Sequence, residues 1–188
     1  MDLVKITATE FGADISLAYA TKENFTGKPV YEKAICYLHI EAAEALKDAI
    51  ESAQNLGYRI RIYDGFRPSE AQWVLWNHTP DPLFLADPRR GSPHSRGVAV
   101  DLTLTMPDGT PLEMGTAFDA FTPKSYHGNS RISKTAQRNR LILLGIMTQA
   151  GWDFYRNEWW HYQLFGSQKY PLISDTEIPE QMMPQPKM

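Results

Sequence analysis

The chain has 188 residues, of which 43% are hydrophobic, and this is enough apolar sequence to bury one substantial core. Its formal net charge is -3, with no run of like charges, so we expect neither nucleic acid nor an anionic membrane surface as a partner. The only cysteine, Cys36, cannot form an intrachain disulfide, and we interpret it as a small buried hydrophobic residue.

No internal linker divides the chain, so one domain spanning residues 1–188 is expected. The tail from about residue 175 contains three prolines and is predicted to be loosely ordered. The first residues lack a basic stretch followed by an apolar run, and no stretch of eighteen apolar residues exists. These features predict a cytoplasmic protein without a membrane span.

The first half of the chain predicts a loop, a helix and a strand. Residues 14–31 mix turn formers with aromatic residues and have no regular period, so an ordered loop is expected. Apolar residues then recur at three- and four-residue steps, which predicts a helix over about 38–56 that ends before Gly57 and packs on a sheet. Alternation over 58–63 predicts a strand. The helical set is Ile40, Ala43, Leu46, Ile50 and Ala53.

The segment Asp64-Gly65-Phe66-Arg67-Pro68 follows this strand and places Arg67 at a strand-to-helix corner. Pro68 keeps Arg67 out of the helical conformation. Ser69 and Gln72 have the spacing of a capping box, which would open a short helix through about Trp76.

The centre of the chain predicts a loop that leads into a strand. Residues 77–93 contain four prolines and should form a loop of the kind that often borders an active site. Residues 98–104 alternate as a half-buried strand does, with Asp101 on the face opposite the valines and leucines. The Asp-Gly pair within 106–110 indicates a hairpin, and hence a sheet that is at least partly antiparallel.

The second half predicts a long surface loop over 114–134, a buried helix over 136–150 ended by Gly151, and two strands at 152–155 and 159–165. Strands mixed with two longer helices indicate the α+β class. We expect helices packed against one side of a largely antiparallel sheet.

The five histidines are not equal candidates for chemistry. His39 begins a predicted helix, and His78 and His127 lie in polar loops, so a solvated or hydrogen-bonded structural role is expected for these three. His94 precedes the strand that carries Asp101, and His161 ends the sequence Glu158-Trp159-Trp160-His161. An aromatic strand segment seldom carries a glutamate and a histidine without a function.

His94, Asp101 and His161 supply the three nitrogen and oxygen ligands of a hydrolytic zinc site, whose fourth position would hold water. Glu158 is then left as the base that takes a proton from this water and gives it to the leaving amine. Residues three apart on a regular strand face opposite ways. We therefore expect Glu158 at the irregular beginning of its strand or on a bulge.

The pattern Ser92-x-His94-x-x-Gly97-x-Ala99-x-Asp101, followed by Glu158-Trp159-Trp160-His161, resembles that of the VanX-type D-alanyl-D-alanine dipeptidases. This branch belongs to a zinc metallopeptidase family that includes D,D-carboxypeptidases and shares its fold with the hedgehog amino-terminal domain. Further segments resemble dipeptidase segments in family order, although residues 125–133 match none. They are residues 19–21, 24–27, 63–68, 114–119 and 136–140.

The resemblance implies that one Zn²⁺ per chain is bound by His94, Asp101 and His161, that Glu158 is the catalytic base, and that Arg67 stabilises the oxyanion. It further implies that Tyr19 and Asp119 hold the free ammonium group of the substrate and that Ser92 lies near the substrate. Two of these residues keep a simpler interpretation. Arg67 could form a salt bridge within a loop, and Asp119 could cap the segment that follows it.

These features predict a zinc dipeptidase that hydrolyses D-alanyl-D-alanine. The alternatives are a D,D-carboxypeptidase or endopeptidase acting on cell-wall peptides, or a non-catalytic binding domain in which zinc is only structural. Glu158 and Arg67 argue against the last, because a structural ion needs neither a base nor an oxyanion partner. Vancomycin resistance and recovery of D-alanine as a nutrient would use the same activity, and the sequence does not separate them. It also leaves the oligomeric state open.

Overall fold

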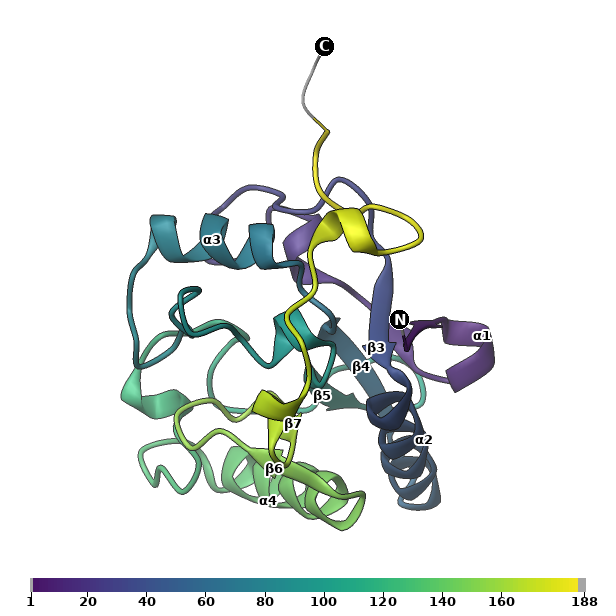
Figure 1. Cartoon of the computed structure of the whole chain (residues 1–188). Coiled ribbons are helices and arrows are strands. Elements are labelled where there is room, and N and C mark those ends of the chain that lie inside the picture. Colours follow the sequence, from purple (N-terminus) through teal and green to yellow (C-terminus); the bar gives the residue numbers. More distant parts are fainter. Residues whose placement is uncertain (1, 186–188) are drawn as a thin grey trace.

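A computed structural model describes residues 2–185 and places a five-stranded sheet at the centre of the fold (Figure 1). Three of its four strand pairs are antiparallel, and only the pair between the short edge strand β2 and β4 is parallel. The α+β fold with a largely antiparallel sheet is therefore confirmed. In sheet order the strands are β2 (Asp14–Ile15), β4 (Arg59–Asp64), β5 (Ala99–Thr105), β7 (His161–Leu164) and β6 (Trp152–Phe154).

The two long helices, α2 (Ile40–Asn55) and α4 (Lys134–Gln149), contact each other and pack on the sheet. Both end just before a glycine with positive φ, Gly57 and Gly151, as the sequence predicted. Ile40, in the first turn of α2, is about half exposed and does not join the core. The buried residues between these helices and the sheet include Leu46, Ile50, Ile60, Ile62, Leu102, Leu104, Leu143 and Met147.

The pairing of β4 with β5 contains a β-bulge between Ile62 and Asp64. Ile62 pairs with Leu102 and Asp64 pairs with Asp101, so Tyr63 stands between them without a partner residue. Paired residues share one face of a sheet. The bulge therefore brings Asp64 to the same face as Asp101.

Three short elements near the start of the chain were not predicted. They are β1 (Leu3–Ile6), α1 (Ala8–Phe11) and β3 (Cys36–His39), and β1 pairs with β3 in a separate two-stranded sheet. Each has only four residues, which is too short to show a clear period. The predicted loop at 14–31 contains β2 and a 3₁₀ helix over Ala18–Ala20.

The capping box predicted for α3 (Ser69–His78) is wrong, because both side chains bond elsewhere. The Ser69 hydroxyl donates to the carbonyl of Ile173 at 3.0 Å, and the Gln72 amide donates to the carbonyl of Ala86 at 2.7 Å. The turn at Asp108-Gly109 forms as predicted, with Gly109 at φ 87°. It leads to a single antiparallel bridge between Thr105 and Pro111 rather than to a second strand.

The prediction of a loosely ordered tail is wrong for residues 175–185, and residues 186–188 lie outside the described part of the chain. Asp175 is buried, and its carboxylate accepts the backbone N–H groups of Met182 and Met183 at 2.7 and 3.2 Å. The tail is fixed because its apolar side chains fill a second core together with Ala71 and Leu75 of α3. Figure 1 shows this tail and α3 at the top, away from α2 and α4. Members of this second core also include Tyr19, Tyr31, Phe66, Ile173, Ile178 and Met182.

Within residues 2–185, every helix is too short or too polar to cross a membrane.

Candidate active site

Two neighbouring strands and the turn before one of them bring the three predicted ligands together. Asp101 on β5 pairs directly with His161 at the start of β7, so their side chains share one face of the sheet. His94 begins a 3₁₀ helix over His94–Arg96, and Gly97 at φ 70° reverses the chain into β5.

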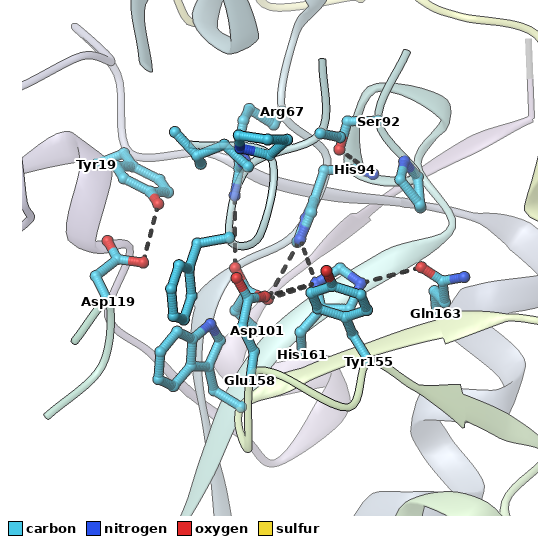
Figure 2. Close-up of a pocket in the computed structure, with 16 residues that line it drawn as sticks. Tyr19, Arg67, Ser92, His94, Asp101, Asp119, Tyr155, Glu158, His161 and Gln163 are labelled. Atoms are coloured by element: carbon cyan, nitrogen blue, oxygen red, sulfur yellow. Dashed lines mark hydrogen bonds and ion pairs between the residues drawn. The ribbon is translucent and has the colours of Figure 1, made fainter. Parts of the chain in front are cut away.

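The three side chains form a nearly equilateral triangle of ligand atoms (Figure 2). His94 Nε2 lies 3.1 Å from His161 Nδ1 and 3.2 Å from Asp101 Oδ1, and His161 Nδ1 lies 3.1 Å from the same oxygen. All three residues are buried. Burial opposes ionisation of Asp101, but the two imidazoles in their charged form outweigh it and hold the pKa of this carboxyl well below its usual value.

The outer nitrogens of both imidazoles bond to oxygens that only accept. His94 Nδ1 lies 2.7 Å from the carbonyl of Gly65, and His161 Nε2 lies 3.1 Å from Gln163 Oε1. These outer nitrogens therefore carry the protons, and the lone pairs of His94 Nε2 and His161 Nδ1 face the centre of the triangle. The arrangement suits a divalent cation that takes two nitrogens and one carboxylate oxygen.

Glu158 lies in the turn between β6 and β7, not on a strand. Its backbone N–H donates to the carbonyl of Tyr155 at 3.2 Å, and its own carbonyl accepts from His161 at 3.4 Å. This is the irregular beginning of the strand that the sequence predicted. The Glu158 carboxylate is 3.9 Å from His161 Nδ1. Burial, with the charges of Asp101 and Asp119, raises its pKa well above the usual value.

Arg67 lies between β4 and α3, and its guanidinium is held from three sides. Nε donates to Asp64 Oδ2 at 2.9 Å, Nη1 donates to Gln72 Oε1 at 2.9 Å, and Nη2 lies 3.5 Å from Asp101 Oδ2. Asp64 also accepts the Tyr31 hydroxyl at 2.9 Å. The simpler interpretation of Arg67 as an ion-pair partner is thus correct in part, but Arg67 also lines the cavity that contains the triangle.

Asp119 and Tyr19 lie at the other side of this cavity (Figure 2). The Tyr19 hydroxyl donates to Asp119 Oδ1 at 3.2 Å, whereas Asp119 Oδ2 is buried without a hydrogen-bond partner among the described residues. Burial, followed by the charge of Asp101, raises the pKa of Asp119 well above its usual value. Thr122, rather than Asp119, caps the 3₁₀ helix over Pro123–Ser125.

The cavity has a volume of about 300 Å³ and contains all eight residues singled out from the sequence. Ser92 lines it and accepts the backbone N–H of His94 at 3.2 Å. The other three histidines lie elsewhere: His39 caps α2, His78 bonds Thr79, and His127 is half-buried in the 114–134 loop. The lining consists of Tyr19, Arg67, Pro82, Phe84, Leu85, Ala86, Ser92, Pro93, His94, Asp101, Asp119, Tyr155, Glu158, Trp160, His161 and Gln163.

Sequence reasoning did not select Asp64, Gln72 or Gln163 as site residues, although they hold Arg67 and His161 in place. Asp64 was visible only as part of the turn before Arg67. Gln163 lies two residues beyond His161 on the same strand and so on the same face, and this spacing was the signal that could have found it.

The family model described as D-ala-D-ala dipeptidase (Peptidase M15) matches residues 1–182. The D-alanyl-D-alanine dipeptidase of Escherichia coli (strain K12) is 42% identical over 174 residues, covering 93% of this chain and 90% of that protein. The D-alanyl-D-alanine dipeptidase of Enterococcus faecium is 39% identical over 167 residues, covering 78% of this chain and 83% of that protein. The solved LdcB LD-carboxypeptidase shares the fold, with a TM-score of 0.51 and 20% identity over 89% of this chain and 70% of that chain. Together with the geometry of the pocket, these matches establish that the chain belongs to the D-ala-D-ala dipeptidase family of peptidases.

Proposed function

We propose that this chain hydrolyses the dipeptide D-alanyl-D-alanine to two molecules of D-alanine, using one Zn²⁺ held by His94, Asp101 and His161. The observation that carries the proposal is the content of one cavity: a triangle of metal-ligand atoms at one side and the buried, unpaired oxygen of Asp119 at another. The first suits hydrolysis, and the second suits a substrate with a free ammonium group. The single domain and the cytoplasmic location remain predictions from the sequence.

The ligand triangle fits zinc. Zinc bonds to nitrogen and oxygen are about 2.0–2.1 Å long, so a tetrahedral ion places its ligands about 3.3 Å apart. The edges of the triangle are 3.1, 3.1 and 3.2 Å. The hydrogen bonds of the outer imidazole nitrogens, from His94 to the carbonyl of Gly65 and from His161 to Gln163, are of the kind that orients imidazoles toward a metal. When bound, zinc would lower the pKa of a water molecule and polarise the scissile carbonyl.

Glu158 is the proposed base. It takes a proton from the attacking water and passes it to the nitrogen of the leaving D-alanine. The raised pKa of the carboxyl supports this role, because the protonated form must last long enough to deliver the proton. Its place in a turn, with the carboxylate 3.9 Å from His161 Nδ1, supports a base that acts on the attacking water without being a ligand itself.

Arg67 is the proposed oxyanion partner. Its guanidinium is fixed by Asp64 and Gln72, so no reorganisation is needed when negative charge develops on the carbonyl oxygen. The side chain is buried and always charged, and a buried cation stabilises an anion more than it would in solution.

Asp119 and Tyr19 are the proposed partners of the substrate ammonium, and Ser92 lies near the substrate. An ammonium would satisfy the free Asp119 oxygen, whereas an acylated nitrogen would leave this buried group unpaired. We therefore expect that the substrate needs a free amine.

The test is an assay of purified protein of known zinc content with the DD, LD, DL and LL alanine dipeptides and with N-acetyl-D-alanyl-D-alanine. We expect cleavage of the DD dipeptide and almost none of its acetylated form. Comparable cleavage of the acetylated dipeptide, or of longer peptides ending in D-alanyl-D-alanine, would favour a D,D-carboxypeptidase or endopeptidase. Zinc binding without any hydrolysis would favour the non-catalytic domain.

A further inference from the structure

Arg140 on α4 is a buried cation that the proposed mechanism does not use. It is 4% exposed, and none of the ion pairs formed within residues 2–185 includes it. Burial lowers its pKa from 12.5 to about 10, which still leaves it charged at neutral pH. Its three shortest hydrogen bonds go to backbone carbonyls: Nε donates to Met114 at 2.7 Å, and Nη1 donates to Lys124 and Tyr126 at 2.9 and 3.1 Å.

These carbonyls lie at the two ends of the segment 114–126, which we call the Asp119 segment. One guanidinium therefore joins both ends, and Asp119 lies between them with φ 57°, a left-handed conformation that is rare for residues other than glycine. Within the segment, the Ser125 hydroxyl donates to the carbonyl of Ala120 at 2.5 Å. A strained backbone of this kind persists only where surrounding bonds fix it.

The same segment is bonded to the turn that carries Glu158. The Trp159 indole N–H donates to the Thr116 hydroxyl at 2.8 Å, and the Trp159 backbone N–H donates to the carbonyl of Ser125 at 3.1 Å. Arg140 Nη2 lies 3.5 Å from the Thr116 hydroxyl, and the guanidinium carbon lies 5.8 Å from the centre of the Trp159 ring. Two proposed site carboxylates, on Asp119 and Glu158, are therefore supported by one assembly.

We propose that Arg140 is a positioning residue for the reaction: it closes the Asp119 segment so that Asp119 meets the substrate ammonium, and through Thr116 and Trp159 it fixes the Glu158 turn. This inference rests on the proposed function. A lysine cannot replace the guanidinium, because a single ammonium group lacks the fork of donors that spans carbonyls on both ends of the segment.

The experiment compares Arg140→Lys with Arg138→Lys, a matched control on the exposed side of the same helix. Both changes are made in a Glu158→Gln background, so that the dipeptide is not consumed. Calorimetry then measures the Kd of D-alanyl-D-alanine and of N-propionyl-D-alanine, which has the same skeleton without the amine. Zinc content and Tm are measured for each protein.

We expect Arg140→Lys to raise the Kd of D-alanyl-D-alanine about tenfold or more, since a displacement of about 1 Å can cost on the order of a hundredfold. The Kd of N-propionyl-D-alanine should change less than about threefold, and Arg138→Lys should affect neither ligand. Equal weakening of both ligands, or of neither, would overturn the positioning role. If Glu158→Gln alone already binds both ligands equally, Asp119 is not an ammonium site, and the proposed function fails at that point instead.

A second pair of variants keeps the inference testable if Arg140→Lys does not fold. Thr116→Val removes the hydroxyl that accepts the Trp159 indole N–H, whereas Thr116→Ser keeps it. With Glu158 intact, we expect Thr116→Val to lower kcat for D-alanyl-D-alanine about tenfold and Thr116→Ser to stay within about twofold of the parent. Equal kcat values for the two variants would contradict the link from the Asp119 segment to Glu158.

Discussion

The three carboxylates of the cavity differ in their partners, and the partners separate their pKa values. Burial opposes the ionisation of Asp101, but the two imidazoles beside it lower its pKa; Asp119 and Glu158 are buried near other carboxylates, so their pKa values rise. Carboxyl groups whose environments push their pKa values apart take different roles in one site. Here the ionised Asp101 suits a ligand and Glu158 suits proton transfer, whereas Asp119 would ionise when an ammonium group pairs with it and lowers its pKa.

Glu158 and His161 should fail in different ways when replaced, although they are only three residues apart. In Glu158→Gln the ligand triangle is intact, so zinc should remain near one per chain while kcat falls about a hundred- to ten-thousandfold. In His161→Ala only two ligands remain, and zinc should be lost on dialysis. Metal analysis and steady-state kinetics separate the two. A Glu158→Gln protein that loses zinc would make Glu158 a ligand, and one with parental activity would move the base elsewhere.

His127 should make folding stability depend on pH. Burial, followed by the nearby charge of Arg140, lowers its pKa from 6.5 to about 4, and its Nε2 has no hydrogen-bond partner among the described residues. The unfolded chain therefore takes up a proton here below about pH 6.5, which the folded chain resists until about pH 4. This contribution to stability is complete above pH 6.5 and is lost as the pH falls.

Comparing His127→Gln with the parent separates the pH dependence of stability caused by His127 from that caused by the carboxylates. Between pH 7 and pH 5 the parent should lose about 1–2 kcal/mol more of its free energy of unfolding than the variant does. Urea titrations at the two pH values measure the difference. Parallel losses in the two proteins would mean that His127 is protonated as easily in the folded state as in the unfolded chain.

At the scale of elements, Gly65 connects the two-stranded sheet of β1 and β3 to the candidate active site. A Cβ at this position would lie 2.9 Å from the carbonyl oxygen of Tyr37 and 3.0 Å from Cys36 Sγ, so only glycine allows the end of β4 to approach β3 this closely. The carbonyl of Gly65 is also the acceptor that orients His94. The packing of β3, a short strand that was not predicted from the sequence, thus reaches the proposed metal ligand His94 through one backbone group.

Gly65→Ala should therefore affect both stability and metal affinity. The close contacts predict a loss of about 1–3 kcal/mol, and displacement of the carbonyl beside His94 predicts about ten- to a hundredfold weaker zinc binding. Gly145→Ala is the matched control, because a Cβ there meets nothing within 4 Å and should add about 0.5–1 kcal/mol of helix stability. Denaturant titrations and competition with a zinc chelator measure the two effects. Unchanged zinc affinity in Gly65→Ala would show that the carbonyl is not needed to orient His94.

At the scale of the whole molecule, the second core joins the tail to the cavity wall. Met182 is fully buried in it together with Tyr19, Tyr31 and Phe66, while Arg67 lies over the Tyr19 ring at 4.9 Å. Residues more than a hundred positions apart in the chain thus support one side of the cavity that contains the ligand triangle.

Met182→Ala should lower the free energy of unfolding by about 2–5 kcal/mol, as expected for removal of a large buried side chain. It should also raise KM, because Tyr19 packs in the same core. Met106→Ala, at a residue that is 44% exposed, is the control and should stay within about 0.5 kcal/mol of the parent. Thermal unfolding and KM measurements test both parts. If stability falls by the expected amount while KM is unchanged, the packing of the tail does not affect the cavity.

Much of the fold and of the site could be predicted from the sequence, because the period of hydrophobic residues in a long segment indicates whether it forms a helix or a strand. The helices at 40–55 and 134–149 and the strand that carries Asp101 lie within about two residues of their predicted positions. The position of Glu158 outside the regular strand could also be predicted, because residues three apart on a strand face opposite ways and Glu158 was expected in the same site as His161. The tail could not be predicted in this way, because its order comes from contacts with Tyr31 and α3, which no local pattern records.

The bulge in β4 decides which face of the sheet Asp64 occupies. Along an uninterrupted ladder Asp64 would stand opposite Val100 and point into the core; with Tyr63 inserted, it stands opposite Asp101. The even-numbered side chains of β4 therefore change face along the strand. Ile60 and Ile62 point into the core, whereas Asp64 lies on the face that carries Asp101. Tyr63 is thus one residue more than a regular ladder needs, because without it Ile62 would still stand opposite Leu102 and Asp64 opposite Asp101. The bulge lets β4 carry this extra residue without turning Asp64 into the core.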